Sequence, residues 1–491
     1  PPRSTLFPYT TLFRSLNANE PVLNQYPRPQ LKREGWTNLN GVWDYTRKTR
    51  DDFGTYKSNE VYRQQILVPF PIESALSGIM DVEYNNQNKS YAYKRVVTIE
   101  KPADSKRVML NFGAVDWHSI VFVNGQKVVE HKGGFNPFSA DITDALNTNG
   151  SQEIVVQVYD PTRGGQPSGK QDQVPGATTY TPVTGIWQTV WTEVVNPVYI
   201  TDVALTPVNN NAVKVKVEAA NAAGATATVK ILDGTTEIAS VDVAVDAETT
   251  IPVANAKLWS PETPFLYNVT VALKKEGVTT DNVTSYFGMR KIEVKKTREK
   301  PYIYLNDQLT FNFAALDQGY FPDGLYTPAS YDAMRHDLVK LKELGFNAVR
   351  KFVKIEPAIW YHIADSLGLL VWQDIPAAHV GTAIAELNTE AARKANFLRE
   401  TAAMTKSIRN FPSVVAWIGF NDGWGRYNMS HVENTVKLFR NLNDGRLVLP
   451  ESGDDNYELG DVVSRHGLPL PQLHANPYNE RASICGVTGN Y

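Results

Sequence analysis

Hydrophobic and polar residues alternate in short runs through the first two hundred residues. KRVVTIE, RVMLNFGAV, HSIVFVNGQKVVE and QEIVVQVYD carry apolar residues at every second position, and turn-forming residues separate them. Alternation with period two is typical of half-buried strands, and short strands at this spacing favour an antiparallel sandwich. We therefore expect an antiparallel sandwich over residues 16–200.

A second all-β stretch follows over residues 201–294. Its runs AVKVKVEAA, TATVKILDG, IASVDVAV and LYNVTVALKK alternate cleanly and carry no helical periodicity. A stretch near ninety residues with this pattern is typical of an immunoglobulin-like sandwich.

Beyond residue 295 continuous apolar runs alternate with amphipathic ones. Continuous apolar strands between helices indicate a parallel sheet that is buried on both faces. No glycine-rich turn of a nucleotide-binding sheet occurs, so residues 295–491 are predicted to form a (β/α)8 TIM barrel with about seven strands present. The predicted strands are FNFAALDQ, FNAVRKF, LLVWQDI, VVAWIGF, RLVLPES, DVVSRHG and ASICGVTGNY, and the predicted helices include YDAMRHDLVKLKELG, PAIWYHIADSLG, ANFLRETAAMTKSIRN and HVENTVKLFRNL.

Both ends of the sequence need separate treatment. Residues 1–15, PPRSTLFPYTTLFRS, resemble the translation of a sequencing-library adapter, so they are set aside as non-native. The sequence stops within or just after the seventh predicted barrel strand. We therefore expect both termini to be truncated, and an open barrel edge to make the chain prone to aggregation.

Composition and charge narrow the possible partners. A formal net charge of −3 gives no reason to expect nucleic acid or an anionic membrane as a partner, and no apolar run reaches the length of a membrane span. The single cysteine, Cys485, excludes an internal disulfide and a multi-thiolate metal site, and it is expected to be a small buried residue on a strand. No cofactor is expected.

Nine stretches, in this order along the chain, carry a family resemblance. This sequence resembles the family two glycoside hydrolases, the group of β-galactosidases and β-glucuronidases. The resemblance implies a jelly-roll sandwich, an immunoglobulin-like sandwich and a TIM barrel, in that order. The stretches are WTNLNGVWDY, VPFPIESALSG, GGFNPFSADIT, TPVTGIWQTVW, LWSPETPFLYNVTV, FGMRKIEV, GFNAVRKFVKIEP, LGLLVWQDIP and RNFPSVVAWIGFND.

The resemblance assigns roles to the end of the fourth barrel strand. There the family has an asparagine that binds the sugar 2-hydroxyl and a glutamate that serves as general acid and then base; Asn421 and Asp422 occupy these places. Asp422 could hold a raised pKa above Trp417 and Trp424 and protonate a leaving oxygen. The alternative is that Asp422 only caps the following segment.

The family nucleophile is a glutamate at the end of strand seven, and Asn490 stands in the matching place. Because an amide cannot be an anionic nucleophile, the double-displacement route would be lost. Phe352 and Phe411 also stand where the family usually has histidines, which makes the expected pocket more apolar.

Other acidic residues at the rim could compensate. Glu451, Asp374 and Glu356 follow strands five, three and two, and a carboxylate at the right separation could run an inverting reaction with Asp422 as acid. The alternative for Glu356 and Asp374 is structural: ion pairs with Arg350 and Lys354, or backbone hydrogen bonds.

Further residues are candidates for substrate binding. Asp160 lies in the sandwich loop that in the family reaches over the barrel mouth, and Asp317 ends strand one. Trp372 and Trp417 could stack on a pyranose or pack in the core, and His466 could touch sugar or satisfy a loop.

The resemblance implies a β-glycoside hydrolase-like protein that acts on terminal β-linked sugars of oligo- or polysaccharides. The shorter acid at Asp422 and the missing nucleophile at Asn490 leave two rivals open: a carbohydrate-binding pseudoenzyme, or a different reaction on the same scaffold. The family also implies a periplasmic or secreted location for the intact protein.

Overall fold

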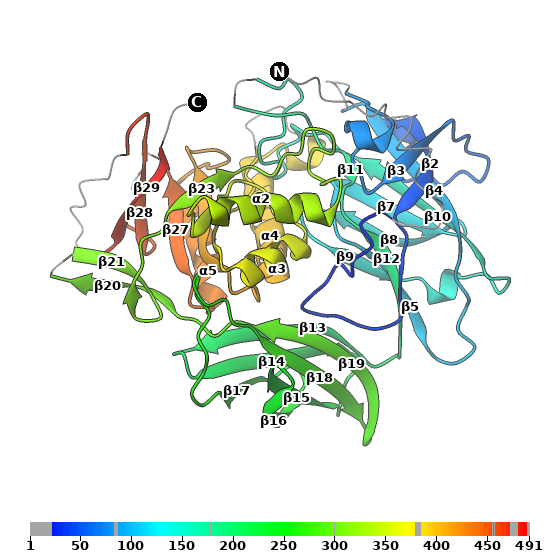
Figure 1. Cartoon of the computed structure of the whole chain (residues 1–491). Coiled ribbons are helices and arrows are strands. Elements are labelled where there is room, and N and C mark those ends of the chain that lie inside the picture. Colours follow the sequence, from blue (N-terminus) through cyan, green and yellow to red (C-terminus); the bar gives the residue numbers. More distant parts are fainter. Residues whose placement is uncertain are drawn as a thin grey trace.

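The computed structural model describes residues 22–82, 87–176, 178–298, 300–378, 384–453, 455, 457–471 and 480–488. Figure 1 shows two β-sandwiches beside a module of parallel strands and helices, in the order that the sequence predicts. Residues 1–15 and Asn490 lie outside the described residues. No helix in the described part is long and apolar enough to cross a membrane.

The first sandwich pairs a six-stranded sheet with a four-stranded sheet. The strand orders are β3-β2-β4-β10-β7-β8 and β1-β12-β5-β9, and β11 pairs with β6 in a short ribbon. Trp43, Tyr45 and Tyr93 lie between the sheets, fully buried. The strands are β1 Trp36–Asn38, β2 Gly41–Thr49, β3 Gln64–Val68, β4 Lys89–Thr98, β5 Arg107–Phe112, β6 Val115–Asp116, β7 His118–Val123, β8 Gln126–Lys132, β9 Phe138–Asp141, β10 Ser151–Tyr159, β11 Gly185–Ile186 and β12 Val190–Val195.

The second sandwich has seven antiparallel strands, in the orders β13-β14-β17 and β16-β15-β18-β19. The alternation is visible in β14, where Val213, Val215 and Val217 are fully buried. The strands are β13 Tyr199–Val208, β14 Ala212–Ala220, β15 Thr226–Asp233, β16 Thr236–Ala244, β17 Glu248–Pro252, β18 Tyr267–Lys275 and β19 Val278–Phe287.

Seven parallel strands form the third module, as the sequence predicts. Five make one sheet in chain order, β23 to β27, and β28 pairs with β29 in a second. An antiparallel hairpin precedes them (β20 Ile292–Thr297, β21 Lys300–Leu305, β22 Gln308–Leu309). The parallel strands are β23 Ala314–Asp317, β24 Ala348–Lys351, β25 Leu370–Asp374, β26 Val414–Asn421, β27 Leu447–Ser452, β28 Val462–Gly467 and β29 Ala482–Thr488.

Within the described residues four α-helices pack outside these strands, and polar side chains cap the N-termini of three of them. Ser330, Thr389 and Asn428 each accept a backbone N–H of the first turn of α2, α4 and α5. Gly368, with φ +68°, ends α3 in the left-handed conformation. The helices are α2 Tyr331–Glu343, α3 Ala358–Leu367, α4 Glu390–Ile408 and α5 Met429–Asn441.

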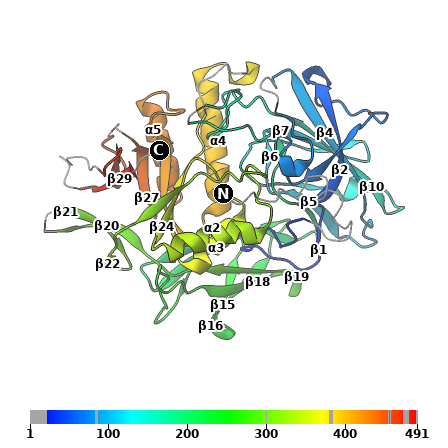
Figure 2. The same cartoon turned by 45° about the horizontal axis from the view of Figure 1, so that its top comes forward.

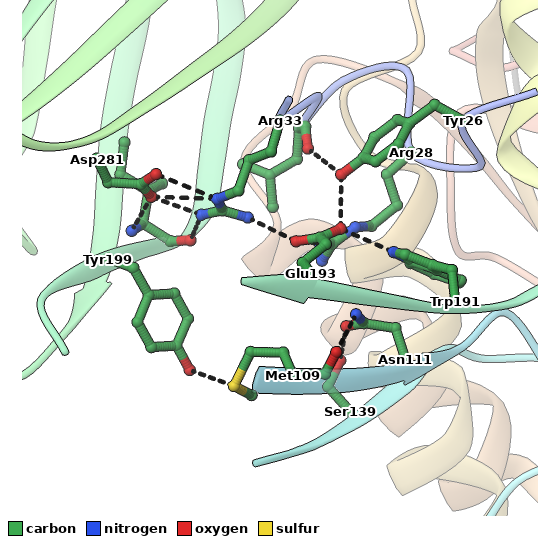
Figure 3. A network of polar contacts seen from close by, with 12 residues as sticks. Tyr26, Arg28, Arg33, Met109, Asn111, Ser139, Trp191, Glu193, Tyr199 and Asp281 are labelled. Atoms are coloured by element: carbon green, nitrogen blue, oxygen red, sulfur yellow. Dashed lines mark hydrogen bonds and ion pairs between the residues drawn. The ribbon is translucent and has the colours of Figure 1, made fainter. Parts of the chain in front are cut away.

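Side chains lock the three modules together. In Figure 2, α4 stands between α5 and the first sandwich, where the Trp117 indole donates to Glu400 at 2.9 Å. The second sandwich binds the barrel through Tyr286, whose hydroxyl donates to buried Asp365 at 2.8 Å. The joint between the sandwiches is a charged network centred on Glu193 (Figure 3).

The first barrel strand, β23, pairs with β24 alone among the described residues. Phe311 and Phe313, just before it, are 80% and 49% exposed, and Leu316 within it is 39% exposed. The predicted open edge is therefore present in the part of the chain that the structure covers. Cys485, expected to be buried, is only partly buried on β29.

Candidate active site

The carboxyl ends of the parallel strands present a chain of polar side chains. Arg350 of β24 donates to both oxygens of Asp374 at the end of β25, at 3.1 and 2.7 Å, and to the Asn421 amide oxygen at 2.9 Å. The Asn421 amide then donates to Asp422 Oδ2 at 2.9 Å. The strand ends therefore bring together three predicted site residues, Asp374, Asn421 and Asp422.

The series of polar contacts extends to the second parallel sheet through His466 of β28. Its Nδ1 lies 3.1 Å from Asp422 Oδ1, and its Nε2 lies 3.1 Å from the hydroxyl of Ser452 at the end of β27. Ser452 also bonds Ser464 at 3.0 Å. His466, predicted either to touch sugar or to satisfy a loop, is thus held between Asp422 and a buried serine pair.

This arrangement is not a nucleophilic triad, although it joins Ser, His and Asp. The Asp422 side chain is 48% exposed, whereas Ser452 is fully buried. A Cβ added at Gly486 would lie 2.6 Å from Ser452 Oγ, so the β29 backbone covers the hydroxyl. We call the series Arg350–Asn421–Asp422–His466–Ser452 the relay. Its exposed group is the Asp422 carboxylate, so a substrate would contact Asp422 and not the serine.

Asp422 is an ionised carboxylate, contrary to the raised pKa expected from the sequence. Burial raises its pKa, but the hydrogen bond and charge of His466, with Asn421 and Arg350, lower it by more, so its pKa lies below the usual value for an aspartate. The expectation is wrong because the neighbours of the carboxylate are donors and cations rather than tryptophans. Asp422 also has φ +47°, a left-handed conformation that aspartate tolerates.

The two tryptophans predicted to bind substrate pack in the core instead. Trp417 is fully buried against Phe439 of α5, and its indole donates to Asp444 at 3.1 Å, so it faces the helices. Trp372 is 4% exposed inside the strand layer and donates to Asn312 at 3.1 Å. Phe411, expected in the pocket, stacks on Tyr361 in the helical core. Phe352 does lie at the mouth, with its ring 5.1 Å from the Arg350 guanidinium carbon.

Asp160 organises its own loop and is not free to bind a sugar hydroxyl directly. It is buried; one oxygen accepts from the Thr162 backbone at 2.7 Å and the other from Thr184 Oγ1 at 2.9 Å. Burial raises its pKa to about 6. Its loop does reach the barrel, because the Ser168 and Gly169 backbone N–H groups both donate to the Ala377 carbonyl.

The remaining predicted carboxylates are paired. Asp317 lies 2.8 Å from Lys351, which also holds Glu356 at 2.6 Å, and Lys354 binds Glu356 at 2.9 Å. These contacts fit the structural interpretation of Glu356, although its partners are lysines and not Arg350. Burial lowers the pKa of Lys354 to about 8.

Glu451 is a candidate compensating carboxylate on β27, the strand next to the one that ends at Asp422. It pairs in register with Phe420, its side chain is 1% exposed, and Arg426 donates to it at 3.1 Å. Burial raises the pKa of Glu451 to about 7, more than Arg426 lowers it. Arg426 also bonds the exposed Asp455. Glu451 can hold a proton near neutrality, but Arg426 and the protein enclose it.

Sequence reasoning missed Lys170 at the mouth. Its ammonium lies 5.3 Å from the centres of the Tyr180 and Phe352 rings and 5.4 Å from that of Trp424. Its only sequence signal is a lysine within the loop motif PSGKQ, which has no periodicity to place it. Among the described residues, no cluster of His, Cys, Asp and Glu is positioned to hold a metal ion.

Comparison with known proteins agrees with this architecture. Residues 72–188 match the glycosyl hydrolase 2 galactose-binding domain-like family, residues 198–290 the glycosyl hydrolases family 2, and residues 328–467 the TIM barrel domain of that family. These matches span all three modules and most of the chain. The chain belongs to family 2 of the glycosyl hydrolases.

Individual relatives are distant. A β-galactosidase of Thermoanaerobacter pseudethanolicus is 26% identical over 66% of this chain and 44% of its own length. A β-glucuronidase of Bacteroides fragilis is 24% identical over 78% of this chain and 56% of its own. The chain spans about half the length of the curated relatives it matches.

Solved structures share the fold. The β-glucuronidase of Ruminococcus gnavus in complex with D-glucuronic acid superposes with a TM-score of 0.75 and 19% identity, covering 91% of this chain and 78% of that one. The β-glucuronidase 3 of Bacteroides uniformis gives a TM-score of 0.72 and 19% identity over 90% and 58%.

Proposed function

We propose that this chain binds, at the ends of strands β24 to β28, a terminal β-linked galactose- or glucuronate-like residue of an oligo- or polysaccharide and belongs to a protein that hydrolyses it. One observation carries the proposal: the relay from Arg350 through Asn421 ends in the exposed carboxylate of Asp422. Oriented amide and carboxylate groups beside aromatic rings are the chemistry that binds sugar hydroxyls. Family membership supports a periplasmic or secreted location for the intact protein.

The proposed hydrolysis is slow, because Asp422 is a poor general acid. A proton donor must be protonated at the working pH, and the pKa of Asp422 is lowered. Aspartate is also one methylene shorter than the family glutamate, and a misplacement of this size costs on the order of a hundredfold in rate. The predicted nucleophile position, Asn490, supplies no anion.

An aryl β-glycoside panel tests this proposal. The panel contains galactoside, glucuronide, glucoside, mannoside and arabinoside, and release of the aryl group is followed by absorbance. Weak release is expected from one of them, with Asp422→Glu faster by on the order of tenfold to a hundredfold. Asp422→Asn has nearly the same size and is expected to lose the activity. Zero release from every glycoside by wild type and by Asp422→Glu would remove the hydrolytic proposal.

The second candidate is carbohydrate binding without turnover. A carboxylate held ionised by His466 accepts hydrogen bonds well and donates none, which favours recognition over acid catalysis. This candidate predicts binding of a methyl β-glycoside by calorimetry with no product. Restoring glutamate at positions 422 and 490 together then changes the affinity little.

A third candidate is an inverting reaction that uses Glu451 with Asp422. The raised pKa of Glu451 favours it as the proton carrier, and its enclosure by Arg426 weighs against it. The anomeric configuration of the first product, observed by NMR, distinguishes inversion from retention.

A further inference from the structure

One cation at the barrel mouth has no carboxylate partner. Arg350 is paired with Asp374, Arg426 with Glu451, and His466 with Asp422. Lys170 alone among these cations makes no ion pair with a carboxylate within the residues that the structure describes. Its ammonium donates a hydrogen bond to the Thr178 carbonyl at 2.6 Å, which uses one of the three N–H donors of the group.

The backbone fixes where Lys170 stands. The N–H of Gly169 donates to the Ala377 carbonyl at 3.0 Å, so the loop contacts the barrel one residue before the lysine. Gly169 has φ +60°, and a Cβ there would lie 2.3 Å from the Val353 carbonyl oxygen. Only glycine allows this approach, which delivers the lysine to the mouth.

The surroundings of the ammonium make it receptive to an anion. Burial lowers the pKa of Lys170, and the negative charge of Asp422 partly opposes that effect, so the two groups share one electrostatic environment. Lys170 is 9% exposed, and aromatic rings replace much of its hydration shell. A charge that has lost water binds an incoming opposite charge more strongly than an exposed one does.

The rings supply the rest of a sugar site. Phe352 and Trp424 meet edge to face, with ring centres 6.4 Å apart, and both flank Lys170. Aromatic faces pack on the C–H surface of a pyranose, while the lysine offers N–H donors beside them. An uncharged sugar would leave those donors without an ionic partner.

We infer that Lys170 is a specificity-determining residue that selects sugars carrying a carboxylate, that is, uronic acids, over their neutral counterparts. This inference rests on the proposed function, since it concerns the same proposed site at the ends of the barrel strands. In this inference the first sandwich recognises the carboxylate of the sugar through Lys170, and the barrel strands recognise its ring hydroxyls.

Calorimetry with matched ligands tests the inference. The probes are methyl β-D-glucuronide against methyl β-D-glucoside, and methyl β-D-galacturonide against methyl β-D-galactoside, with the full chain. The acidic member of at least one pair should bind on the order of tenfold more tightly, and raising the salt concentration should weaken only the acidic member.

Variants assign the preference to the residue. Lys170→Met keeps the stem and removes the charge; it should lower affinity for the acidic sugar about tenfold and leave the neutral one within about threefold. Lys170→Arg should retain the preference, and Lys127→Met, at an exposed pair with Glu130, should change neither.

Three results would overturn the inference. Equal affinity of wild type for both members of each pair refutes it while the proposed function stands, and this holds even if no variant folds. Equal weakening of both members by Lys170→Met shows that the lysine only supports the shape of the loop. If no sugar binds wild type at all, the proposed function fails and takes this inference with it.

Discussion

Two charged networks in this protein differ in whether all of their charged groups are paired within the protein. At the joint between the sandwiches, Glu193 accepts from Arg28 at 2.5 and 2.7 Å and from Arg33 at 3.2 Å, and Arg33 also holds Asp281 at 2.7 Å (Figure 3). We call this set the joint network. Trp191 and Tyr26 add hydrogen bonds to Glu193, both at 2.7 Å. Each charge there is met by an opposite charge from another segment.

The network at the barrel mouth is open at one end. Arg350 and Asp374 are paired within it, but Asp422 is half exposed and Lys170 has no carboxylate partner among the described residues. Satisfied buried networks fix structure, whereas groups with remaining donors or acceptors at a surface are available to a ligand. The paired network holds the two sandwiches together, whereas the network with available groups is suited to bind a ligand. Both networks are built from arginine and carboxylate side chains.

Breaking the joint network should have the largest effect on stability. Burial raises the pKa of Glu193, but the charge of Arg28, with the Trp191 hydrogen bond and Arg33, lowers it below its usual value. Glu193→Gln leaves Arg28 with no carboxylate partner among the residues that the structure describes. We expect the free energy of unfolding, measured by urea denaturation, to fall by about 3–5 kcal/mol. Sugar affinity of the folded variant should not change; a loss of affinity without a loss of stability would erase the distinction between the networks.

The next largest effect is the contribution of Glu451 to the pH dependence of the free energy of unfolding. Its pKa is about 7 in the folded protein and 4.5 ordinarily, so the folded state binds its proton more tightly than the unfolded state does. Stability therefore falls as pH rises from about 4.5 to 7 and stays low above that. Glu451→Gln should remove this slope, a difference on the order of 1–2 kcal/mol between pH 5 and 8 after allowance for solvent near Arg426. Asp455→Asn, at the exposed partner of Arg426, is the control; a slope unchanged in Glu451→Gln would refute the assignment.

A smaller effect is expected for ligand affinity when the contact between His466 and the exposed carboxylate of Asp422 is removed. His466→Gln removes the largest influence that lowers the pKa of Asp422, so the carboxylate should protonate at higher pH. Saccharide affinity at pH 7 should fall about fivefold, and on acidification from pH 5 to 4 it should fall further than the affinity of wild type does. Calorimetry at three pH values measures this, and exposed His336→Gln is the control. Identical pH profiles for His466→Gln and wild type would mean that the relay does not tune Asp422.

The smallest effect comes from an exposed pair of the same chemistry. Lys230 and Glu237 lie 2.8 Å apart at 47% and 45% exposure. Glu237→Gln should change the free energy of unfolding by less than about 0.5 kcal/mol in the same urea experiment, because water screens the pair. A loss as large as that of Glu193→Gln would show that burial does not explain the strength of the joint network.

Periodicity alone predicted the three modules and the positions of the barrel strands. It could not predict which way side chains point in β26, because all eight residues of that strand are buried and no alternation marks an inner face. Periodicity therefore left both a sugar contact and core packing open for Trp417, which faces α5 in the core. The pKa of Asp422 depends on His466, a partner from another strand that spacing cannot reveal, and the role of Asn490 stays a prediction.

The loop that carries Lys170 has one further consequence. It belongs to the first sandwich, yet its backbone is hydrogen-bonded to the Ala377 carbonyl of the barrel and lies close to the Val353 carbonyl. One side of the proposed site is thus encoded in a different part of the gene from the strands that carry Asp422. Exchanging residues 160–184 between homologous chains is a route to altered ligand preference that leaves the barrel sequence untouched.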